Sequence, residues 1–232
     1  MLEIEKKYFV GNYDDTLNLL QKRFGKYETE VKSGFWWRSN CSGLENILDL
    51  NEPKLLKKEA SVIKEIGEFV FPAQDYDFVR IRIINSNKYS VTFKNKALIK
   101  NIERNTEYEF EIEKDLLLRI IDFLQENCFI FYYNIKESRV FKKKDISIEL
   151  STFNDLVSPY LEIEALGDNE EELFSRIEQT INQMNLTSLK EEPKNYVELS
   201  FMENKNRLRN VKISAYSREA FKELQNKLND NG

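Results

Sequence analysis

Apolar and charged residues alternate with a period of two along six short segments of the chain. In the first, residues 2–10, Ile4 and Tyr8 fall on one parity while Glu5 and Lys7 fall on the other. The same alternation occurs in residues 79–83, 89–94, 107–113, 146–151 and 161–164. It is typical of β-strands that have one apolar and one charged face. Turn-forming residues at 85–87 and 142–145 predict hairpins.

Apolar residues at helical spacing predict four helices, over residues 15–24, 116–126, 170–184 and about 218–229. The predicted N-terminal caps are an Asp before the first helix, then Asp115, Asp168-Asn169 and Ser217, and Gly25 is the predicted C-terminal glycine of the first helix. Residues 39–68 alternate least clearly and are predicted to be a partly helical insertion. Strands outnumber helices, so the expected fold class is α+β, dominated by an antiparallel sheet.

The chain contains no histidine among its 232 residues. This excludes Ser-His-Asp and Cys-His catalysis and any zinc site with histidine ligands. A metal site has to be built from carboxylates, which favour hard cations such as Mg²⁺ or Mn²⁺. Charged residues make up 32% of the chain although the net charge is only −5, so the arrangement of the charges matters more than their sum.

The sequence shows no signal peptide and no apolar stretch long enough to cross a bilayer. Its first ten residues are rich in charge, and no apolar run approaches the roughly 20 residues that a membrane helix needs. We therefore expect a cytoplasmic protein without a membrane partner.

The charged faces of the predicted strands carry tight clusters of charge. One strand places four glutamates at alternate positions, Glu107, Glu109, Glu111 and Glu113. Like charges at this spacing weaken a strand unless a divalent metal ion or facing Arg and Lys residues neutralise them. Any one such strand is usually half exposed to water. A barrel with all of these faces inward would instead surround one polyanion, with metal on the carboxylates and phosphates on the basic side chains.

Six short motifs in chain order resemble those of the CYTH family, also called triphosphate tunnel metalloenzymes. They are Glu3-Ile4-Glu5-Lys6-Lys7, Arg80-Ile81-Arg82, Thr92-Phe93-Lys94, Arg104 followed by Glu107-Tyr108-Glu109-Phe110-Glu111, Arg139, and Glu162-Ile163-Glu164. The resemblance covers residues 1–200, with 39–68 as an insertion and 201–232 as a C-terminal helical extension. It implies a closed antiparallel β-barrel, the triphosphate tunnel, with helices packed outside.

The resemblance also implies roles for these residues in metal-dependent hydrolysis of a triphosphate. It assigns Mg²⁺ or Mn²⁺ to Glu3, Glu5, Glu162 and Glu164, while Glu109 and Glu111 share this task or hold a second ion. It assigns the phosphates to Arg80, Arg82, Lys94, Arg104 and Arg139. The catalytic residues that it implies are Glu3, Glu5 and Lys7, and Lys7 contacts phosphate or helps to orient the attacking water. Alternatively, Lys7 simply neutralises Glu3 and Glu5.

Two positions depart from the family pattern. Glu137 stands where a Lys or Arg is usual two residues before Arg139, and the nearby Lys136 has the opposite parity. Ser151 stands where an Asp is common ahead of the closing Glu-x-Glu motif. Both differences bear on the second metal ion and on the activation of water.

Three functions stay open from the sequence. The first is a hydrolase of tripolyphosphate, of a nucleoside or thiamine triphosphate, or of an RNA 5′-triphosphate. The second is a class IV-type adenylate cyclase that makes cyclic AMP and pyrophosphate, and the third is a binding module without turnover. The run Phe35-Trp36-Trp37 is interpreted either as a stacking surface for a base, as at an RNA 5′ end, or as core, and one Trp can serve each purpose.

Overall fold

The computed structural model describes residues 2–38, 78–99, 102–127, 129–143, 146–186, 189–203 and 213–229. Within these ranges, the side chains of residues 2–3, 38, 78, 94–99, 102–108, 123, 126–127, 129 and 213–217 are not described. The predicted insertion at 39–68 lies outside the described residues.

Eight strands form one antiparallel sheet in the order β1-β8-β7-β6-β2-β3-β4-β5. Their bounds are β1 Leu2–Phe9, β2 Glu28–Arg38, β3 Phe78–Ile84, β4 Lys88–Ile99, β5 Ile102–Ile112, β6 Phe129–Lys143, β7 Ile146–Phe153 and β8 Tyr160–Gly167. All six alternating segments are therefore strands, and β2 and β6 are additions that the alternation did not predict.

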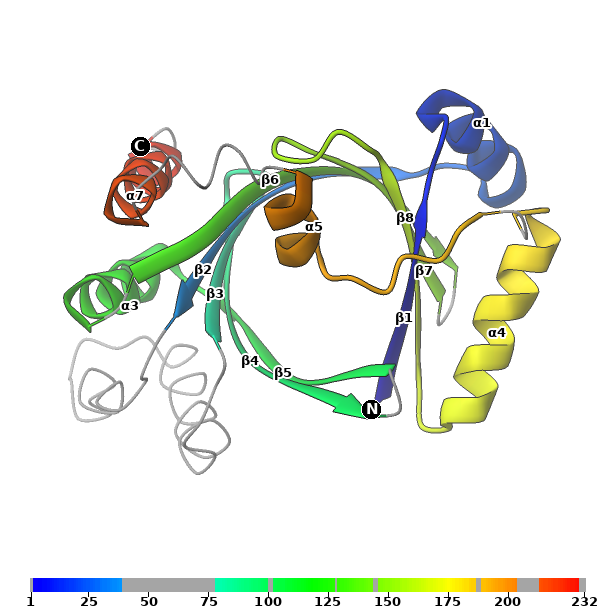
Figure 1. Cartoon of the computed structure of the whole chain (residues 1–232), viewed down its shortest axis with the longest axis horizontal. Helices are drawn as coiled ribbons and strands as arrows, with labels where there is room; N and C mark the ends of the chain where they lie inside the picture. The colour runs from blue at the N-terminus through cyan, green and yellow to red at the C-terminus, as the bar shows by residue number, and fades with distance from the viewer. Residues whose placement is uncertain are drawn as a thin grey trace. The chain divides into compact units, whose positions relative to one another are not determined.

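The described residues also contain five helices (Figure 1). They are α1 Tyr13–Phe24, α3 Lys114–Asn127, α4 Glu170–Gln183, α5 Tyr196–Glu203 and α7 Ile213–Asn229. The four predicted helices are confirmed, and α5 was not predicted. Its eight residues are too few for helical spacing to stand out in the sequence.

The helix ends show which predicted caps were right. Asn169 accepts hydrogen bonds from the backbone N–H groups of Glu171 and Glu172, and Gly25 ends α1 with a φ of 84°. Helix α1 begins earlier than predicted, because Asn12 and not an Asp accepts the hydrogen bond of its cap. The proposed caps at Asp115 and Ser217 are wrong, since α3 and α7 already include both positions.

The predicted hairpin at 85–87 joins β3 to β4. Asn85 and Ser86 have φ values of 48° and 64°, and the N–H of Asn87 donates to the carbonyl of Ile84. Two successive residues with positive φ are characteristic of a type I′ turn, whose twist matches the strands that it joins.

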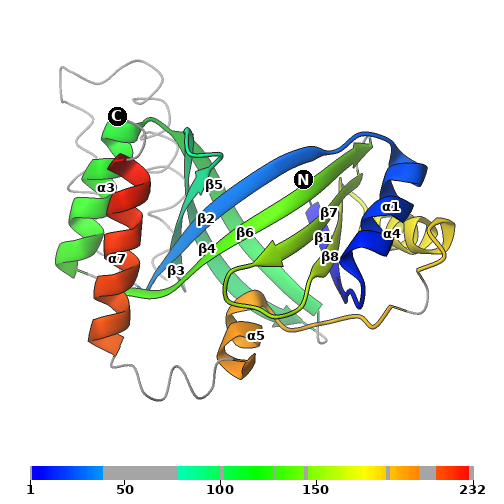
Figure 2. The same ribbon diagram turned by 90° about the horizontal axis from the view of Figure 1, so that it is seen from above.

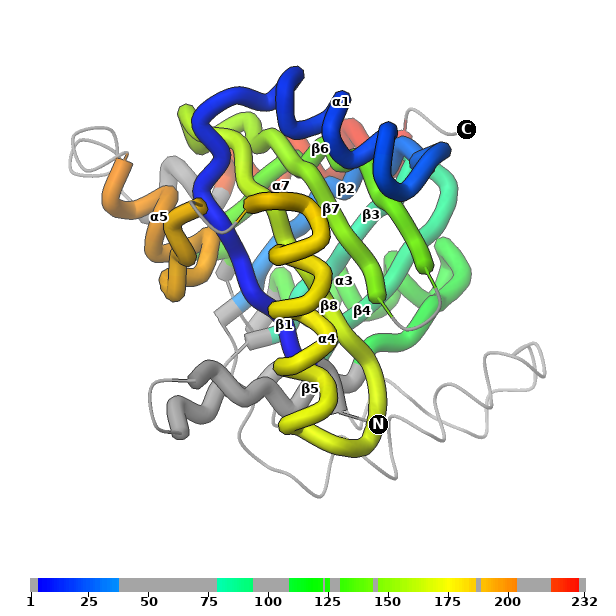
Figure 3. Tube along the Cα trace, turned by 90° about the vertical axis from the view of Figure 1, so that its right-hand side faces the viewer, coloured from blue at the N-terminus to red at the C-terminus, as the bar shows by residue number. Residues whose placement is uncertain are grey.

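The chain forms two compact units, and each has its own core. Unit 1 consists of residues 1–31 and 134–210, and unit 2 of residues 32–133 and 211–232. The core of unit 1 lies between one face of β1, β8, β7 and β6 and the helices α1 and α4. Figures 2 and 3 show α1 and α4 on this side of the strands, with α4 running along β1 and β8.

The opposite face of these strands in unit 1 carries α5. Leu199 of α5 packs with Phe153 and Tyr160 in a separate small cluster, and Figure 1 shows α5 across the strands from α4. The segment before α5 lies along β1, where the N–H of Phe9 donates to the carbonyl of Lys190 and that of Glu192 donates to the carbonyl of Lys7. These contacts hold α5 against the strand face that is rich in charge.

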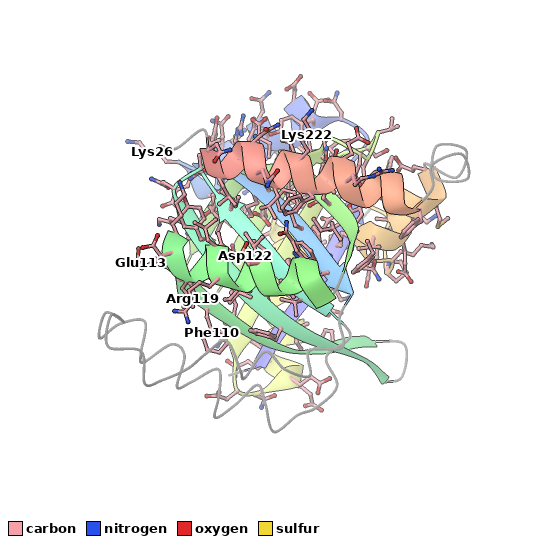
Figure 4. All side chains as sticks on the ribbon, turned by 90° about the vertical axis from the view of Figure 1, so that its left-hand side faces the viewer. Lys26, Phe110, Glu113, Arg119, Asp122 and Lys222 are labelled. Atoms are coloured by element: carbon pink, nitrogen blue, oxygen red, sulfur yellow. The ribbon has the colours of Figure 1, made fainter. Side chains whose placement is uncertain are left out.

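In unit 2, the helices α3 and α7 cover the apolar face of β2, β3 and β4 (Figure 4). Leu116, Leu117 and Ile120 of α3 and Leu224 of α7 are buried in this core. The Lys114 ammonium also donates to the carbonyl of Leu228 at 2.7 Å, which ties the start of α3 to the end of α7. The face of the sheet that α3 and α7 leave uncovered carries the charged residues.

The closed barrel that the family resemblance implied is not confirmed. Hydrogen bonds among the described residues leave β1 and β5 as the two ends of the strand order. What the structure shows is an α+β fold with an eight-stranded antiparallel sheet. None of the described helices is both long and apolar enough to cross a membrane.

Candidate functional site

The strand register places the predicted carboxylates of unit 1 on one face. Glu5 and Lys7 of β1 pair with Glu164 and Glu162 of β8, and Glu162 pairs in turn with Glu149 of β7. Directly paired residues of antiparallel strands point to the same side of the sheet. This side lies opposite the face that packs on α1 and α4. Apolar and charged residues therefore alternate along residues 2–10, since one face of the strand meets the core and the other carries the charges.

Lys136 of β6 lies at the centre of this face. Its ammonium group forms ion pairs with the carboxylates of both Glu149 and Glu162. Burial by itself lowers the pKa of Lys136, but the charges of Glu149 and Glu162 outweigh it and raise the pKa above its usual value. Lys136 therefore stays charged, and we refer to Glu5, Lys7, Lys136, Glu149 and Glu162 as the acidic cluster.

Among the carboxyl groups of the acidic cluster, that of Glu5 has a clearly raised pKa. Burial, the charge of Glu162 and a hydrogen bond between the two carboxyl groups raise the pKa of Glu5 well above its usual value, although Lys7 and Lys136 oppose this. The side chain of Glu5 is nevertheless accessible to water, so we give the neighbouring carboxylate more weight than burial as the cause. A carboxyl group beside a second carboxylate keeps its proton to higher pH unless a cation offsets the neighbouring charge.

Aromatic rings of α5 and β7 complete the surroundings of the two lysines. The ammonium of Lys7 lies 4.3 Å from the centre of the Tyr196 ring, and that of Lys136 lies 5.6 Å from the same ring. Tyr196 packs on Phe153 at 4.2 Å between ring centres. Burial and the charges of Glu162 and Glu5 raise the pKa of Tyr196 well above its usual value, so its hydroxyl keeps its proton.

The residues of the acidic cluster suit a hard divalent cation. Lys136 already holds Glu149 and Glu162 around one positive charge, and Glu5 reaches Glu162. Carboxylate oxygens are the ligands that Mg²⁺ and Mn²⁺ prefer. The described side chains contain no group of three or more carboxylates already spaced as a metal site. The ammonium of Lys136 supplies the positive charge between Glu149 and Glu162.

Arg139 does not join the acidic cluster. It pairs across the strands with Leu150, which belongs to the core beneath α1 and α4. Its guanidinium bonds to Glu137 at 2.8 Å and lies 5.7 Å from the centre of the Tyr27 ring. The structure thus places Lys136, and not Arg139, on the charged face of β6.

The predicted site residues of unit 2 come together around Glu109. Arg80 and Arg82 of β3 approach its carboxylate at 3.2 and 3.8 Å, and Ser90 of β4 donates to it at 2.8 Å. Arg80 also donates to the hydroxyl of Thr92 at 3.1 Å. We refer to Arg80, Arg82, Ser90, Thr92 and Glu109 as the basic cluster. Here facing arginines neutralise Glu109, which is one of the two alternatives for the glutamate strand.

Two further predicted site residues lie beside the two clusters, and three others are located only by the strand register of their backbone. Glu111 pairs with Ser90 and is exposed, while Glu164 pairs with Glu5 and is partly buried. The side chains of three more lie outside the description. They are Glu3 in β1 opposite Leu166, Lys94 in β4 opposite Glu107, and Arg104 in β5 opposite Ala97.

The run Phe35-Trp36-Trp37 serves two purposes. Phe35 and Trp37 are 0% and 2% exposed in the core of unit 2. Trp36 pairs with Arg80 and so lies on the charged face, where its ring centre is 4.9 Å from that of Tyr132. The interpretation of this run as core is therefore confirmed for two of the three rings.

Three residues of the acidic cluster and its surroundings were not predicted from the sequence. Glu149 occupies the charged position of an alternating strand, and Lys136 has the opposite parity to Arg139, which is the basic residue that the motif indicates. Tyr196 gave no signal, because it reaches Lys7 only through the path of the segment that follows α4. Strand register and a long-range contact were needed to find them.

A comparison with protein-family models finds one match that spans both units. The family model of the CYTH domain matches residues 56–196, which is more than half of the chain. No curated protein matches the sequence.

Several solved structures share the fold. Protein PH1012 from Pyrococcus horikoshii OT3 has a TM-score of 0.59 at 23% identity, covering 85% of this chain and 99% of that chain. A protein of Vibrio parahaemolyticus provisionally named an adenylate cyclase has a TM-score of 0.54 at 15% identity, covering 86% and 97%. HpAC1 from Hippeastrum, reported to reveal a dominant triphosphatase activity, has a TM-score of 0.55 at 12% identity, covering 88% and 95%. Identities this low establish a common fold and leave the substrate open.

Proposed function

The chain belongs to the CYTH domain family, and from this premise we propose that it is a metal-dependent triphosphatase. The reaction is hydrolysis of a phosphoric anhydride bond in a triphosphate, with Mg²⁺ or Mn²⁺ as the cofactor. A nucleoside triphosphate, thiamine triphosphate and inorganic tripolyphosphate are its candidate substrates, and an RNA 5′-triphosphate is a larger one. The activity reported for HpAC1 supports hydrolysis over cyclisation.

One observation carries this proposal: in each charged cluster, a residue of the opposite charge lies between two like charges. Lys136 lies among Glu5, Glu149 and Glu162, and Glu109 lies between Arg80 and Arg82. A polar face made only for water gains little from such clusters, since exposed ion pairs contribute about 0–1 kcal/mol each. Clusters that receive a metal ion and phosphate groups need neutralisation while empty, and Lys136 and Glu109 provide it.

The acidic cluster would hold the metal ion. In this proposal Glu5, Glu149 and Glu162 supply oxygen ligands, with Glu164 and Glu3 as further candidates from β8 and β1. A divalent ion bound there would offset charge on the phosphate oxygens and help to activate water. Metal binding there would favour the ionised form of Glu5, whose pKa is raised, because a metal ligand has to be ionised.

The lysines of unit 1 would act directly on the substrate. Lys136 is held by two carboxylates, and its ammonium would be available to a phosphate oxygen if a bound cation offset their charge. Lys7 is 9% exposed and lies over the Tyr196 ring. This position limits its movement, so Lys7 offers a fixed positive charge to the phosphate chain or to the attacking water.

The basic cluster would bind phosphate oxygens. The guanidinium groups of Arg80 and Arg82 suit this task because each presents several N–H donors in a fixed plane. Thr92 and Glu109 already orient Arg80. Donors that are fixed in advance stabilise the charge that develops during phosphoryl transfer without the cost of reorganisation. Lys94 and Arg104 remain predicted additions to this set.

The test is to analyse the products formed from tripolyphosphate, ATP, GTP and thiamine triphosphate, with Mg²⁺, Mn²⁺ or EDTA. Release of orthophosphate that requires metal supports hydrolysis. Release of pyrophosphate together with cyclic AMP from ATP would replace the triphosphatase by a cyclase. Metal-dependent binding of a triphosphate without products would leave a binding module.

A further inference from the structure

We propose that Trp36, supported by Tyr132, is a stacking surface for a flat heteroaromatic group on the substrate. The preferred substrate is then a nucleoside triphosphate or a similar heteroaromatic triphosphate, and not inorganic tripolyphosphate. This inference rests on the proposed function, because it extends the phosphate site at Arg80 and Arg82.

Trp36 does not contribute to the core of unit 2. Phe35 and Trp37 point to the core side of β2 and are almost fully buried there. Trp36 points to the other side and is partly exposed. A large apolar side chain outside the core does not gain the full stabilisation of burial, so packing alone gives a weak reason for tryptophan at this position.

The cross-strand neighbours of Trp36 are polar. Trp36 pairs across the strands with Arg80, and Arg80 pairs in turn with Thr92. The next pair on the same face is Arg82 with Ser90. An indole ring among guanidinium and hydroxyl groups is what a ligand with both an aromatic and an anionic part requires.

The ring of Trp36 is supported from one side. The centres of the Trp36 and Tyr132 rings are 4.9 Å apart with the planes inclined by 50°. Tyr132 itself is 3% exposed, so it is a firm support. A ring that is held in advance loses little conformational entropy when a second ring stacks on it.

Trp36 lies close enough to Arg80 for one ligand to contact both. Cross-strand neighbours have Cβ atoms about 4.5–5.5 Å apart, so a phosphate group on Arg80 lies within one side chain of Trp36. A nucleoside joined to that phosphate chain can reach the indole without leaving unit 2. Stacking of a base on an aromatic side chain typically changes affinity by about 5- to 150-fold.

The test compares Trp36→Ala and Trp36→Phe with the unchanged protein, using ATP and tripolyphosphate as probes and Mn²⁺ as the metal. We expect Trp36→Ala to raise the KM for ATP by about tenfold or more, and Trp36→Phe to retain most of the affinity. Tripolyphosphate turnover should stay unchanged in both variants, which also shows that they fold. Leu118→Ala, an exposed residue on α3 of the same unit, is the matched control.

Intrinsic fluorescence gives a second readout that does not need turnover. The chain has only two tryptophans, Trp36 and Trp37, and Trp37 is 2% exposed. ATP should quench the emission of the unchanged protein but not that of Trp36→Phe, and tripolyphosphate should quench neither.

Equal changes for ATP and tripolyphosphate, or no change for ATP, would overturn the stacking inference and leave the triphosphatase proposal intact. Failure of both probes to bind the unchanged protein would overturn the proposed function, and the stacking inference with it.

Discussion

The two charged clusters solve the same electrostatic problem with opposite signs. In unit 1 a single ammonium, that of Lys136, holds two carboxylates. In unit 2 a single carboxylate, that of Glu109, holds two guanidinium groups. The exposure of the two central residues differs, because the side chain of Lys136 is 13% exposed and that of Glu109 is 37% exposed.

This difference in exposure indicates that the acidic cluster depends more on its counter-charge, Lys136, than the basic cluster depends on Glu109. Removing one partner of a buried ion pair leaves an uncompensated charge in the interior and costs much stability. Removing one partner of an exposed pair costs little, because water solvates the charge that remains. The acidic cluster should therefore be coupled to folding and to metal binding, and the basic cluster mainly to substrate. Substitutions in the two clusters test this contrast, and the largest effect is expected at the centre of the acidic cluster.

Removing Lys136 should destabilise the protein more than any other change considered. Lys136→Met leaves Glu149 and Glu162 facing each other without the ammonium that lies between them, which costs about 3–5 kcal/mol for a buried pair that loses one partner. We expect a large drop in thermal stability in EDTA, and a recovery on addition of Mn²⁺ that exceeds the shift in the unchanged protein. A drop that Mn²⁺ does not reverse would contradict the assignment of the metal ion to this cluster.

Removing Arg80 should affect turnover more than folding. Arg80→Ala deletes a donor that is fixed in advance toward phosphate, and losses of about 100- to 1,000-fold in kcat are usual for such donors. Phosphate release with saturating metal is the measurement, and circular dichroism checks the fold. Arg176→Ala, which breaks an exposed pair with Glu172 on α4, is the matched control. Full activity of Arg80→Ala would remove the basic cluster from the site.

The raised pKa of Glu5 predicts a pH dependence of stability in the absence of metal. Between the usual pKa of a glutamate and the raised pKa of Glu5, the folded state holds more protons than the unfolded state. The free energy of unfolding should therefore fall as the pH rises through this window, and Glu5→Gln should remove that part of the fall. Thermal melts in EDTA from about pH 4 to about pH 8 measure it.

Metal provides the control for this pH dependence. Mn²⁺ favours the ionised form of Glu5. In the unchanged protein it should therefore reduce the fall in the free energy of unfolding with rising pH, and in Glu5→Gln it should change that pH dependence little. Identical pH profiles of the two proteins in EDTA would contradict the assigned coupling between Glu5 and Glu162.

A smaller effect is expected for the buried serine pair between β6 and β7. The hydroxyl groups of Ser138 and Ser151 lie 2.9 Å apart, and both residues are 0% exposed. Ser151→Ala leaves one buried hydroxyl without this partner, at a cost of about 1–3 kcal/mol. The double variant Ser138→Ala/Ser151→Ala should recover most of this loss in urea unfolding. If the losses in unfolding free energy of the two single variants simply add in the double variant, the two hydroxyl groups do not stabilise each other.

The smallest effect is expected for Arg139. Its ion pair with Glu137 is partly exposed and should contribute about 0–1 kcal/mol. Arg139→Ala should therefore leave phosphate release unchanged, whereas Lys136→Met should lower it even when metal restores the fold. A loss of activity in Arg139→Ala would support the role in phosphate binding that the sequence motif implies for Arg139. It would contradict the inference from the strand register that Lys136 serves the site in its place.

Alternation of residue type was enough to predict most of the sheet. A strand with one face against a helix and one charged face has a strict period of two, as in β1 and β3. The strand β6 could not be predicted in this way, because its charged face includes buried side chains, among them Asn134 and Ser138. Its polarity therefore follows no simple pattern.

The sequence predicted individual site residues less completely than it predicted strands. Glu5, Lys7 and Glu162 were found because they alternate within one short motif, and Arg80 with Arg82 for the same reason. The choice between Arg139 and Lys136 depends on one residue of register, and a shift by one residue moves every side chain to the other face. Contacts of Tyr196 depend on how a non-repetitive segment folds back along β1, which no local pattern encodes.

The central claim is that one metal-dependent reaction on a triphosphate needs both clusters. The most direct measurement follows orthophosphate release from ATP and tripolyphosphate, with and without Mn²⁺, for the unchanged protein, Glu162→Gln and Arg80→Ala. We predict metal-dependent release that is lost in both variants, with added Mn²⁺ partly compensating for Glu162→Gln only. Release that survives in either variant, or no release by the unchanged protein with any metal, would contradict this claim.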